Sequence, residues 1–240
     1  MNSKFVSDTV FDGVVYKQKP FPYTIVDNFL NKENLPTILN EINNLDNKNA
    51  NSQFTDHRSI YEFNKYAFSV NYGDYLKSLF AELNSDAFIH KLETLTGIYG
   101  LVRNDITLQG AGIHRIENFG HLQLHTDFNI YEHNGVKLDR RINLLIYMNP
   151  YWSEEFNGHL MLFNKANMQC FEKIEPIINR CVIFNTSNKS LHGHPMPLNV
   201  PEGIRRQSIS VYYYTKNMNG VTDFEGDTKH NTKWYSSAMP

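Results

Sequence analysis

A few residues in the second half of the chain have the types and spacing of a metal centre. His125 and Asp127 are two positions apart, so on a strand both side chains project to the same side. A second imidazole comes from residues 190–195 (SLHGHP), where His192 and His194 have the same parity and the spacing does not choose between them. Two imidazoles and one carboxylate suit a divalent iron whose remaining coordination positions stay open for small ligands.

Arg206 follows these candidate ligands and has the properties of a carboxylate-binding residue. A guanidinium that points into a barrel needs a partner, because a lone buried charge is unfavourable. Its planar fork binds a carboxylate in bidentate fashion, and Ser208 on the same strand face would add a hydroxyl donor. Tyr147 faces the same interior by parity, either as a core aromatic residue or as a hydroxyl donor. These residues predict a site for a dicarboxylate co-substrate.

Each residue also has a simpler interpretation when it is taken alone. A His-x-Asp tripeptide occurs by chance in many chains and is typical of a hydrogen-bonded histidine in a turn. His121 and His125 are four apart, a zinc spacing on a helix, but the segment lacks the glutamate of HExxH and has the pattern of a strand. His114 fits a surface histidine better than a rim or co-substrate contact. The prediction therefore depends on the combination of residues.

Polar side chains occupy one face of three expected strands, at 121–127, 141–149 and 206–215. Ordinary solvent faces favour Lys, Glu and Thr, whereas these faces carry His, Asp, Tyr and Arg. The pattern indicates a barrel with a polar site inside and an outer apolar face covered by helices. The three faces comprise His121, Gln123, His125 and Asp127; Asn143, Leu145 and Tyr147; and Arg206, Ser208 and Ser210.

The elements that would position these residues fall into two parts. Apolar spacing predicts helices at about 32–45, 75–83 and 85–95, after a short strand at 23–26. Beyond Gly97, short β-type segments separated by Gly, Asn and Pro predict a sandwich or jelly roll, with further strands at 158–163 and 180–185. The expected fold class is mainly β with an α annex, in which N-terminal helices support a jelly-roll core.

Length and composition predict one domain and exclude several classes of partner. The chain has 240 residues, of which 41% are apolar, and a net charge of −2, which favours neither nucleic acid nor a membrane surface. Two cysteines are too few for a disulfide framework and lack metal-site spacing. Residues 1–19 have no apolar segment of signal-peptide length and no run approaches a membrane span, so the expected location is the cytoplasm.

Five stretches resemble the 2-oxoglutarate- and Fe(II)-dependent oxygenase superfamily, and within it the prolyl-4-hydroxylase-like branch. They are residues 120–129 (GHLQLHTDFN), 141–152 (RINLLIYMNPYW), 158–163, 179–186 (NRCVIFNT) and 190–214. The SxHGHP segment, the Pro-Glu-Gly turn at 201–203 and the Arg-x-Ser strand that ends in three tyrosines are distinctive in combination.

The resemblance covers about residues 19–215 and implies a double-stranded β-helix. The expected division is an N-terminal extension (1–19), one dioxygenase domain (20–216) and an irregular tail (217–240) in which Trp234 and Tyr235 could act as anchors. Within the domain, helical support would span about 28–97 and the jelly-roll core about 98–216.

The resemblance also implies the site and its cofactors. It implies His125, Asp127 and His192 as iron ligands, and Arg206, aided by Tyr147, on the distal carboxylate of 2-oxoglutarate. The cofactors implied are Fe(II), 2-oxoglutarate and O2, with ascorbate as an accessory reductant. The presence of Asp127 argues against the halogenase variant, in which the carboxylate is replaced.

The expected function is hydroxylation of a substrate C–H, favouring a prolyl or other amino-acid residue, with release of succinate and CO2. The substrate would be a protein, a peptide or a small molecule. At residues 157–159 the chain has Asn-Gly-His where relatives often carry Gly-Gly-acidic, which bears on substrate preference. One alternative is the same chemistry on a glycan or small-molecule metabolite. The other is a non-catalytic binding module, which would not need all four residues, that is, the three metal ligands together with the arginine.

Overall fold

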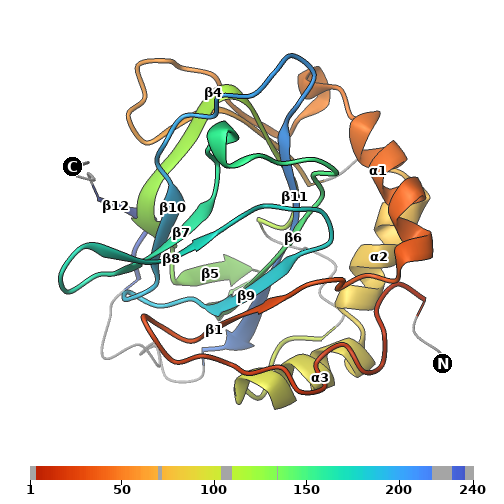
Figure 1. Ribbon diagram of the computed structural model, residues 1–240. Coiled ribbons are helices and arrows are strands. Elements are labelled where there is room, and N and C mark those ends of the chain that lie inside the picture. The colour runs from red at the N-terminus through yellow and green to blue at the C-terminus, as the bar shows by residue number, and fades with distance from the viewer. Residues whose placement is uncertain (1–3, 70–71, 104–109, 134, 218–228, 236–240) are drawn as a thin grey trace.

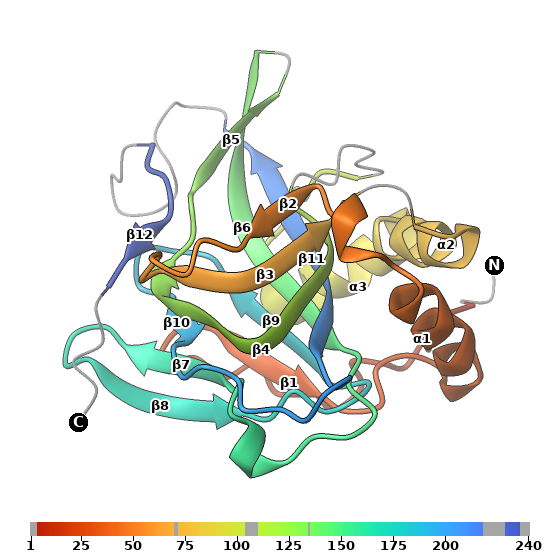
Figure 2. The same ribbon diagram turned by 90° about the horizontal axis from the view of Figure 1, so that it is seen from above.

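The computed structural model describes residues 4–69, 72–103, 110–133, 135–217 and 229–235, which form a curled antiparallel sheet with α-helices along one side (Figures 1 and 2). The helices are α1 (Leu35–Asn43), α2 (Asp74–Leu83) and α3 (Asp86–Thr96), with 3-10 turns at Lys32–Asn34, Asn47–Asn49 and Glu154–Phe156. The strands are β1 (Tyr23–Val26), β2 (Ser52–Phe54), β3 (Glu62–Phe68), β4 (Gly112–Thr126), β5 (Ile130–His133), β6 (Val136–Tyr147), β7 (Leu160–Asn164), β8 (Gln169–Ile174), β9 (Cys181–Asn185), β10 (Leu191–His194), β11 (Arg206–Lys216) and β12 (Lys233–Trp234).

The strands form one hydrogen-bonded path that rolls up on itself. Its order is β1-β9-β6-β11-β4-β10-β7-β8, with β3 and β12 added along β4, β2 on β3, and β5 on β6. β4 runs through the bend, because its first half pairs with β11 and its second half with β10. The two ends of the path meet where the hydroxyl of Tyr23 on β1 donates to Glu172 on β8 at 2.5 Å. This double-stranded β-helix confirms the predicted jelly-roll core.

The helices cover the apolar face of the larger wall of the roll, as the strand patterns predict. One buried cluster joins Ile38 of α1, Leu79 of α2 and Leu92 of α3 to the outward faces of β6, β9 and β11. Each large apolar side chain buried in this way contributes about 1.5–3 kcal/mol to the stability of the fold.

The ends of α3 carry the capping residues that such a helix requires. The Ser85 hydroxyl accepts from the Phe88 N–H at the start of α3, and Gly97 ends the helix with a φ of 71°. Among the described helices, none is long and apolar enough to span a bilayer.

β2 and β3 lie between α1 and α2, a region for which the sequence analysis predicts no strand. β3 pairs with β4, and the pairing shifts register between Phe63 and Lys65, where Asn64 has a φ of 50°. This irregularity breaks the period-two pattern on which a strand prediction depends. β3 matters for function because it adds its own side chains to the wall of the roll.

Arg115 on β4 ties the helical layer to the sheet. Its guanidinium is 1% exposed and donates to the carbonyls of Ile42 and Leu45 at the end of α1, at 2.8 and 2.7 Å. It also donates to the side-chain oxygens of Asn47 (2.7 Å) and of Gln207 on β11 (3.0 Å). These bonds join carbonyls at and just beyond the C-terminus of α1 to the sheet.

Arg115→Met should lower the free energy of unfolding by about 3 kcal/mol, because charge-assisted hydrogen bonds are lost and their acceptors stay buried. For a chain of this size, the melting temperature falls by about 2–4 °C per kcal/mol. Thermal unfolding followed by circular dichroism measures the change. Arg58→Met is the control, since Arg58 pairs with Asp56 in solvent and its loss should leave the melting temperature unchanged. Equal melting of Arg115→Met and the unsubstituted protein would contradict this role.

Candidate active site

His125, Asp127 and His192 converge inside the roll, although some sixty-five positions separate the last two. His125 on β4 lies directly opposite His192 on β10, and Asp127 follows the end of β4. Their ligand atoms all lie within 4.8 Å of one another, and all three residues are buried. The Nε2 atoms of His125 and His192 lie 3.6 and 3.7 Å from the Asp127 oxygens. The histidine that joins this group is therefore His192, and not His194.

Backbone carbonyls fix the orientation of both histidine rings. The Nδ1–H of His125 donates to the Gln123 carbonyl and that of His192 to the Ser190 carbonyl, each at 2.8 Å. Because Nδ1 carries the proton, Nε2 keeps its lone pair and faces Asp127. Burial, followed by the nearby His125 ring, lowers the pKa of His192 to about 4, so the ring is neutral and able to bind a metal.

Asp127 is held by two buried neighbours on β6. The Asn143 amide donates to Asp127 Oδ2 at 2.7 Å, and the Arg140 guanidinium lies 3.2 Å from the same atom. Burial opposes ionisation of this carboxyl, but Arg140 and then His192 hold its pKa well below the usual value. The guanidinium also donates to Asn143 Oδ1 and stacks over the Tyr212 ring at 3.7 Å. Asp127 is thus an oriented carboxylate.

The sequence analysis missed Arg140, because this residue lies outside the alternation assumed for the strand at 141–149. The pairing of β6 with β11 shifts register between Tyr213 and Tyr214, so that Arg140 pairs with Tyr214 while Ile142 pairs with Tyr213. The extra residue in β6 turns Arg140 toward the interior. The only signal in the sequence was the arginine pair Arg140 and Arg141 at the start of a strand with a polar face.

Arg206 lies at the start of β11, and its side chain reaches the interior. It donates to the Gly158 carbonyl at 2.6 Å and to the Tyr147 hydroxyl at 3.2 Å, and it is 6% exposed. Within the described residues, no carboxylate forms an ion pair with it. Burial lowers the pKa of Arg206 below its usual value, and Tyr147 acts in the opposite direction, so the group stays charged. A buried guanidinium without a counter-ion is suited to an anionic ligand.

Gly158 shapes the pocket around this arginine. Its φ is +71°, and a Cβ at this position would lie 2.5 Å from the Leu198 side chain and 3.2 Å from Arg206 Cδ. Glycine is therefore required both for the backbone conformation and for the close approach. The departure from the family pattern at 157–159 leaves this glycine in place.

The other predicted residues also reach the interior. Ser208 and Ser210 are buried on β11, 3.5 Å apart at their hydroxyls, and both line the cavity. The Tyr147 hydroxyl accepts from Arg206, so its own proton remains available for donation. His114, expected on the surface, lines the cavity instead and contacts Ser210 through Nδ1 at 3.3 Å.

The polar face predicted for residues 121–127 is wrong in its first half. Leu122 lines the cavity together with His125 and Asp127, whereas His121 and Gln123 do not. The pairing of β4 with β10 shifts register between the His125–His192 pair and the Leu122–His194 pair. The extra residue on β4 reverses which side chains point into the cavity on one side of the shift relative to the other. The alternation of side chains along the strand therefore correctly places His125 and Asp127 on the cavity side, but it assigns the residues before His125 to the wrong faces.

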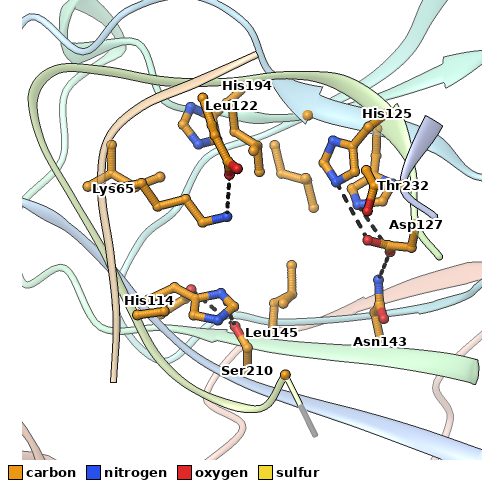
Figure 3. A pocket seen from close by; sticks show the side chains of 18 of the residues that line it. Lys65, His114, Leu122, His125, Asp127, Asn143, Leu145, His194, Ser210 and Thr232 are labelled. Atoms are coloured by element: carbon orange, nitrogen blue, oxygen red, sulfur yellow. Dashed lines mark hydrogen bonds and ion pairs between the residues drawn. The ribbon is translucent and has the colours of Figure 1, made fainter. Parts of the chain in front are cut away.

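A single cavity of about 340 Å³ contains these groups (Figure 3). Asp127 lies across it from Lys65 and His114. Part of the C-terminal tail, expected to be irregular, closes one side: β12 pairs with β4 next to His125. There the Trp234 ring lies 5.0 Å from the His125 ring and stacks on Tyr61 at 5.2 Å. Residues 218–228 and 236–240 of the tail lie outside the described residues.

The donor set fits Fe(II). Two neutral imidazoles with free Nε2 atoms and one ionised carboxylate form one face of a coordination sphere, and this set leaves further positions open. A structural zinc site would instead be closed by four protein ligands. The uncompensated Arg206 in the same cavity fits the far carboxylate of a dicarboxylic acid.

Comparisons with known proteins agree with this geometry. Residues 111–214 match the family model of the 2OG-Fe(II) oxygenase superfamily. Among curated protein sequences, none matches the chain significantly.

Solved structures share the fold at low identity. A prolyl-4-hydroxylase from Pseudomonas putida superposes with a TM-score of 0.55 at 15% identity, over 87% of this chain and 98% of that one. A prolyl hydroxylase from Trichoplax adhaerens, in complex with a hypoxia inducible factor peptide fragment, gives 0.56 at 20% identity, over 80% and 83%. HygX from Streptomyces hygroscopicus, with nickel, 2-oxoglutarate and hygromycin B bound, gives 0.50 at 12% identity, over 88% and 93%.

The family model covers His125, Asp127, His192 and Arg206, and the fold matches that of two prolyl hydroxylases over 87% and 80% of the chain. The family match and the group of His125, Asp127 and His192 support hydroxylase chemistry with Fe(II) and 2-oxoglutarate. Residues 111–214 thus match the 2OG-Fe(II) oxygenase superfamily, the fold is similar to that of prolyl-4-hydroxylases, and with its His-Asp-His triad the protein is a 2-oxoglutarate-dependent dioxygenase.

Proposed function

We propose that this enzyme hydroxylates a C–H bond of an amino-acid substrate, a prolyl or other residue, and releases succinate and CO2. In this proposal His125, Asp127 and His192 bind the iron, and Arg206, Tyr147 and Ser208 bind the far carboxylate of 2-oxoglutarate. The domain that carries the activity would extend over residues 20–216. The observation that carries the proposal is that a buried, pre-oriented ligand triad and an uncompensated arginine face one cavity.

The reaction balances with the two co-substrates. One oxygen atom of O2 enters the substrate C–H bond, and the other enters succinate as 2-oxoglutarate loses CO2. When bound, Fe(II) supplies the oxygen activation that couples these two oxidations. The remaining tasks belong to the chain: to orient the co-substrate, hold the ligands and limit the access of water.

Each of these tasks has residues that support it. Arg140 and Asn143 hold Asp127 ionised and oriented. Arg206 has five guanidinium N–H groups, of which Gly158 and Tyr147 use two, so three remain for a carboxylate that could enter without displacing either bond. Four apolar side chains in the cavity lining limit the number of water molecules that the cavity holds. They are Ile116, Leu122, Leu145 and Leu160.

The substrate class is the least constrained part of the proposal. The prolyl-4-hydroxylase-like fold supports an amino-acid substrate, while the hygromycin B complex of HygX shows that a small molecule enters a related fold. A glycan or metabolite substrate and a catalytically silent binding module are the alternatives. Measurement of products separates all of them.

The test is to incubate the purified protein with Fe(II), 2-oxoglutarate and O2, with and without proline-rich peptides and free amino acids. We expect slow succinate formation that depends on Fe(II) and stops with a chelator, and a mass gain of one oxygen atom in an amino-acid substrate. Succinate without any amino-acid product, but with an oxidised glycan or metabolite, would transfer the chemistry to the alternative substrate class. The absence of Fe(II)-dependent succinate under every condition would favour the binding module.

A further inference from the structure

The end of the cavity that faces Asp127 carries charged and polar groups to which the reaction assigns no role. Lys65 and His114 project into the space opposite His125 and Asp127, and Lys65 points its ammonium group toward the cavity (Figure 3). Glu62, which also lines the cavity, lies on the same strand as Lys65. A prolyl ring alone presents no charge that would require such groups.

Lys65 and Glu62 form a sheltered pair of opposite charges. The Lys65 ammonium lies 2.9 Å from Glu62 Oε2, and the two side chains are only 16% and 17% exposed. The ammonium has three donors and this bond uses one of them. The carboxylate likewise has acceptor positions to spare. The pair therefore offers one positive and one negative anchor side by side.

His194 is the second, independent sign that a ligand belongs here. It is 2% exposed and lines the cavity, and within the described residues neither of its ring nitrogens has a hydrogen-bond partner. Buried polar atoms are nearly always hydrogen-bonded, so this ring has a donor and an acceptor available for a bound molecule. The strand register places it beside the ion pair, because His194 and Glu62 each pair with Leu122 of β4 from opposite sides.

The charged groups at this end of the cavity suit a ligand that carries both a positive and a negative charge. Burial, followed by the positive charge of Lys65, lowers the pKa of His114 to about 3, so His114 is a neutral hydrogen-bonding group. Of the other cations near His114, Arg140 is matched by Asp127, and Arg206 is assigned to 2-oxoglutarate. Lys65 is paired with Glu62, and this pair has donors and acceptors to spare for a ligand that carries both charges.

We infer that Lys65, Glu62 and His194 bind the two main-chain charges of a free α-amino acid, and that such a zwitterion is the substrate. Lys65 and the His194 ring N–H would hold the α-carboxylate, and Glu62 would accept from the α-ammonium. A residue within a peptide has neither charge and gains nothing from these anchors. The inference rests on the proposed function, because an amino acid bound in this way would point its side chain toward the metal ligands, where hydroxylation is proposed to take place.

The test measures binding separately from turnover. The protein is loaded anaerobically with Fe(II) and 2-oxoglutarate and titrated with the twenty L-amino acids, and fluorescence reports binding because Trp234 lines the cavity. Trp152→Phe leaves Trp234 as the single tryptophan, since the chain has two. We expect one or a few amino acids to bind. Their amides and N-acetyl derivatives, each with one charge removed, should bind at least about 10-fold more weakly.

Lys65→Met should weaken binding of the same amino acid by about 10- to 100-fold and leave the KM for 2-oxoglutarate unchanged. Lys77→Met is the matched control, because Lys77 forms an exposed pair with Asp74 on α2. Glu62→Lys combined with Lys65→Glu keeps an ion pair in place and reverses its polarity. This double variant should fold and lose the amino-acid response, which separates recognition from stability.

Three results would overturn the inference. One is Fe(II)-dependent succinate formation without binding of any amino acid; this leaves the proposed function intact. Another is equal binding of an amino acid and its amide. The third is a raised KM for 2-oxoglutarate in Lys65→Met, which would assign Lys65 to the co-substrate. If the unsubstituted protein forms no succinate at all, the proposed function itself fails.

Discussion

His192→Ala abolishes 2-oxoglutarate turnover and metal binding in this account. His192 supplies one of two imidazole donors, and its ring is held by the Ser190 carbonyl with Nε2 facing Asp127. Loss of an outer partner of a metal ligand typically costs 10- to 100-fold, so loss of a ligand should lower turnover by more than about 100-fold. Succinate formation and bound iron after gel filtration measure the two effects.

The matched control is His121→Ala. His121 lies on β4, four residues before His125, but its ring packs toward Phe63 and does not line the cavity. This variant should keep the iron content and turnover of the unsubstituted protein. Retained turnover in His192→Ala would show that His192 is not a ligand and that another side chain completes the site.

Arg206→Met should raise the KM for 2-oxoglutarate by at least about 30-fold, since loss of a buried, hydrogen-bonded charge partner weakens binding by 2 kcal/mol or more. Arg206→Lys should be intermediate, because an ammonium keeps the charge but lacks the planar fork. The rate of succinate formation against the concentration of 2-oxoglutarate gives both values. Bound iron should remain, because the metal ligands lie elsewhere in the cavity.

Arg205→Met is the control for the neighbouring charge. Arg205 is the adjacent residue, is 35% exposed at its side chain and lies 3.3 Å from Glu117. Its loss should leave the KM for 2-oxoglutarate unchanged. If Arg205→Met and Arg206→Met changed this KM equally, the effect would reflect overall charge and not a carboxylate-binding residue.

The strand patterns predict much of the fold because most strands are regular where they pack. The apolar residues that face the helices alternate without a break from Ile142 to Ile146 on β6 and on to Met148 just after it, and the buried helix faces follow the 3.6-residue period. The family resemblance implied His192 as the third ligand; position and parity alone left His192 and His194 equivalent. The structure separates them, because His192 pairs with His125 and a register shift follows before His194.

The features that were missed have a common physical cause. Arg140 and Leu122 reach the interior through irregular pairings, which a period-two pattern does not include. Glu62 and Lys65 lie on a strand with its own register shift, and β12 is two residues long. Such positions depend on partners that are distant in sequence. The ligand triad was therefore accessible from the sequence, whereas the opposite end of the cavity was not.

The most direct test of the central claim is an anaerobic titration of the protein with Fe(II) and 2-oxoglutarate, followed by visible absorption. A metal held by His125, Asp127 and His192, with the co-substrate on its open positions, should give the weak charge-transfer band of an Fe(II)–2-oxoglutarate complex only when both are added. His192→Ala should give no band at the same concentrations. A band of equal strength in His192→Ala, or no band in the unsubstituted protein, would contradict the assignment of this site.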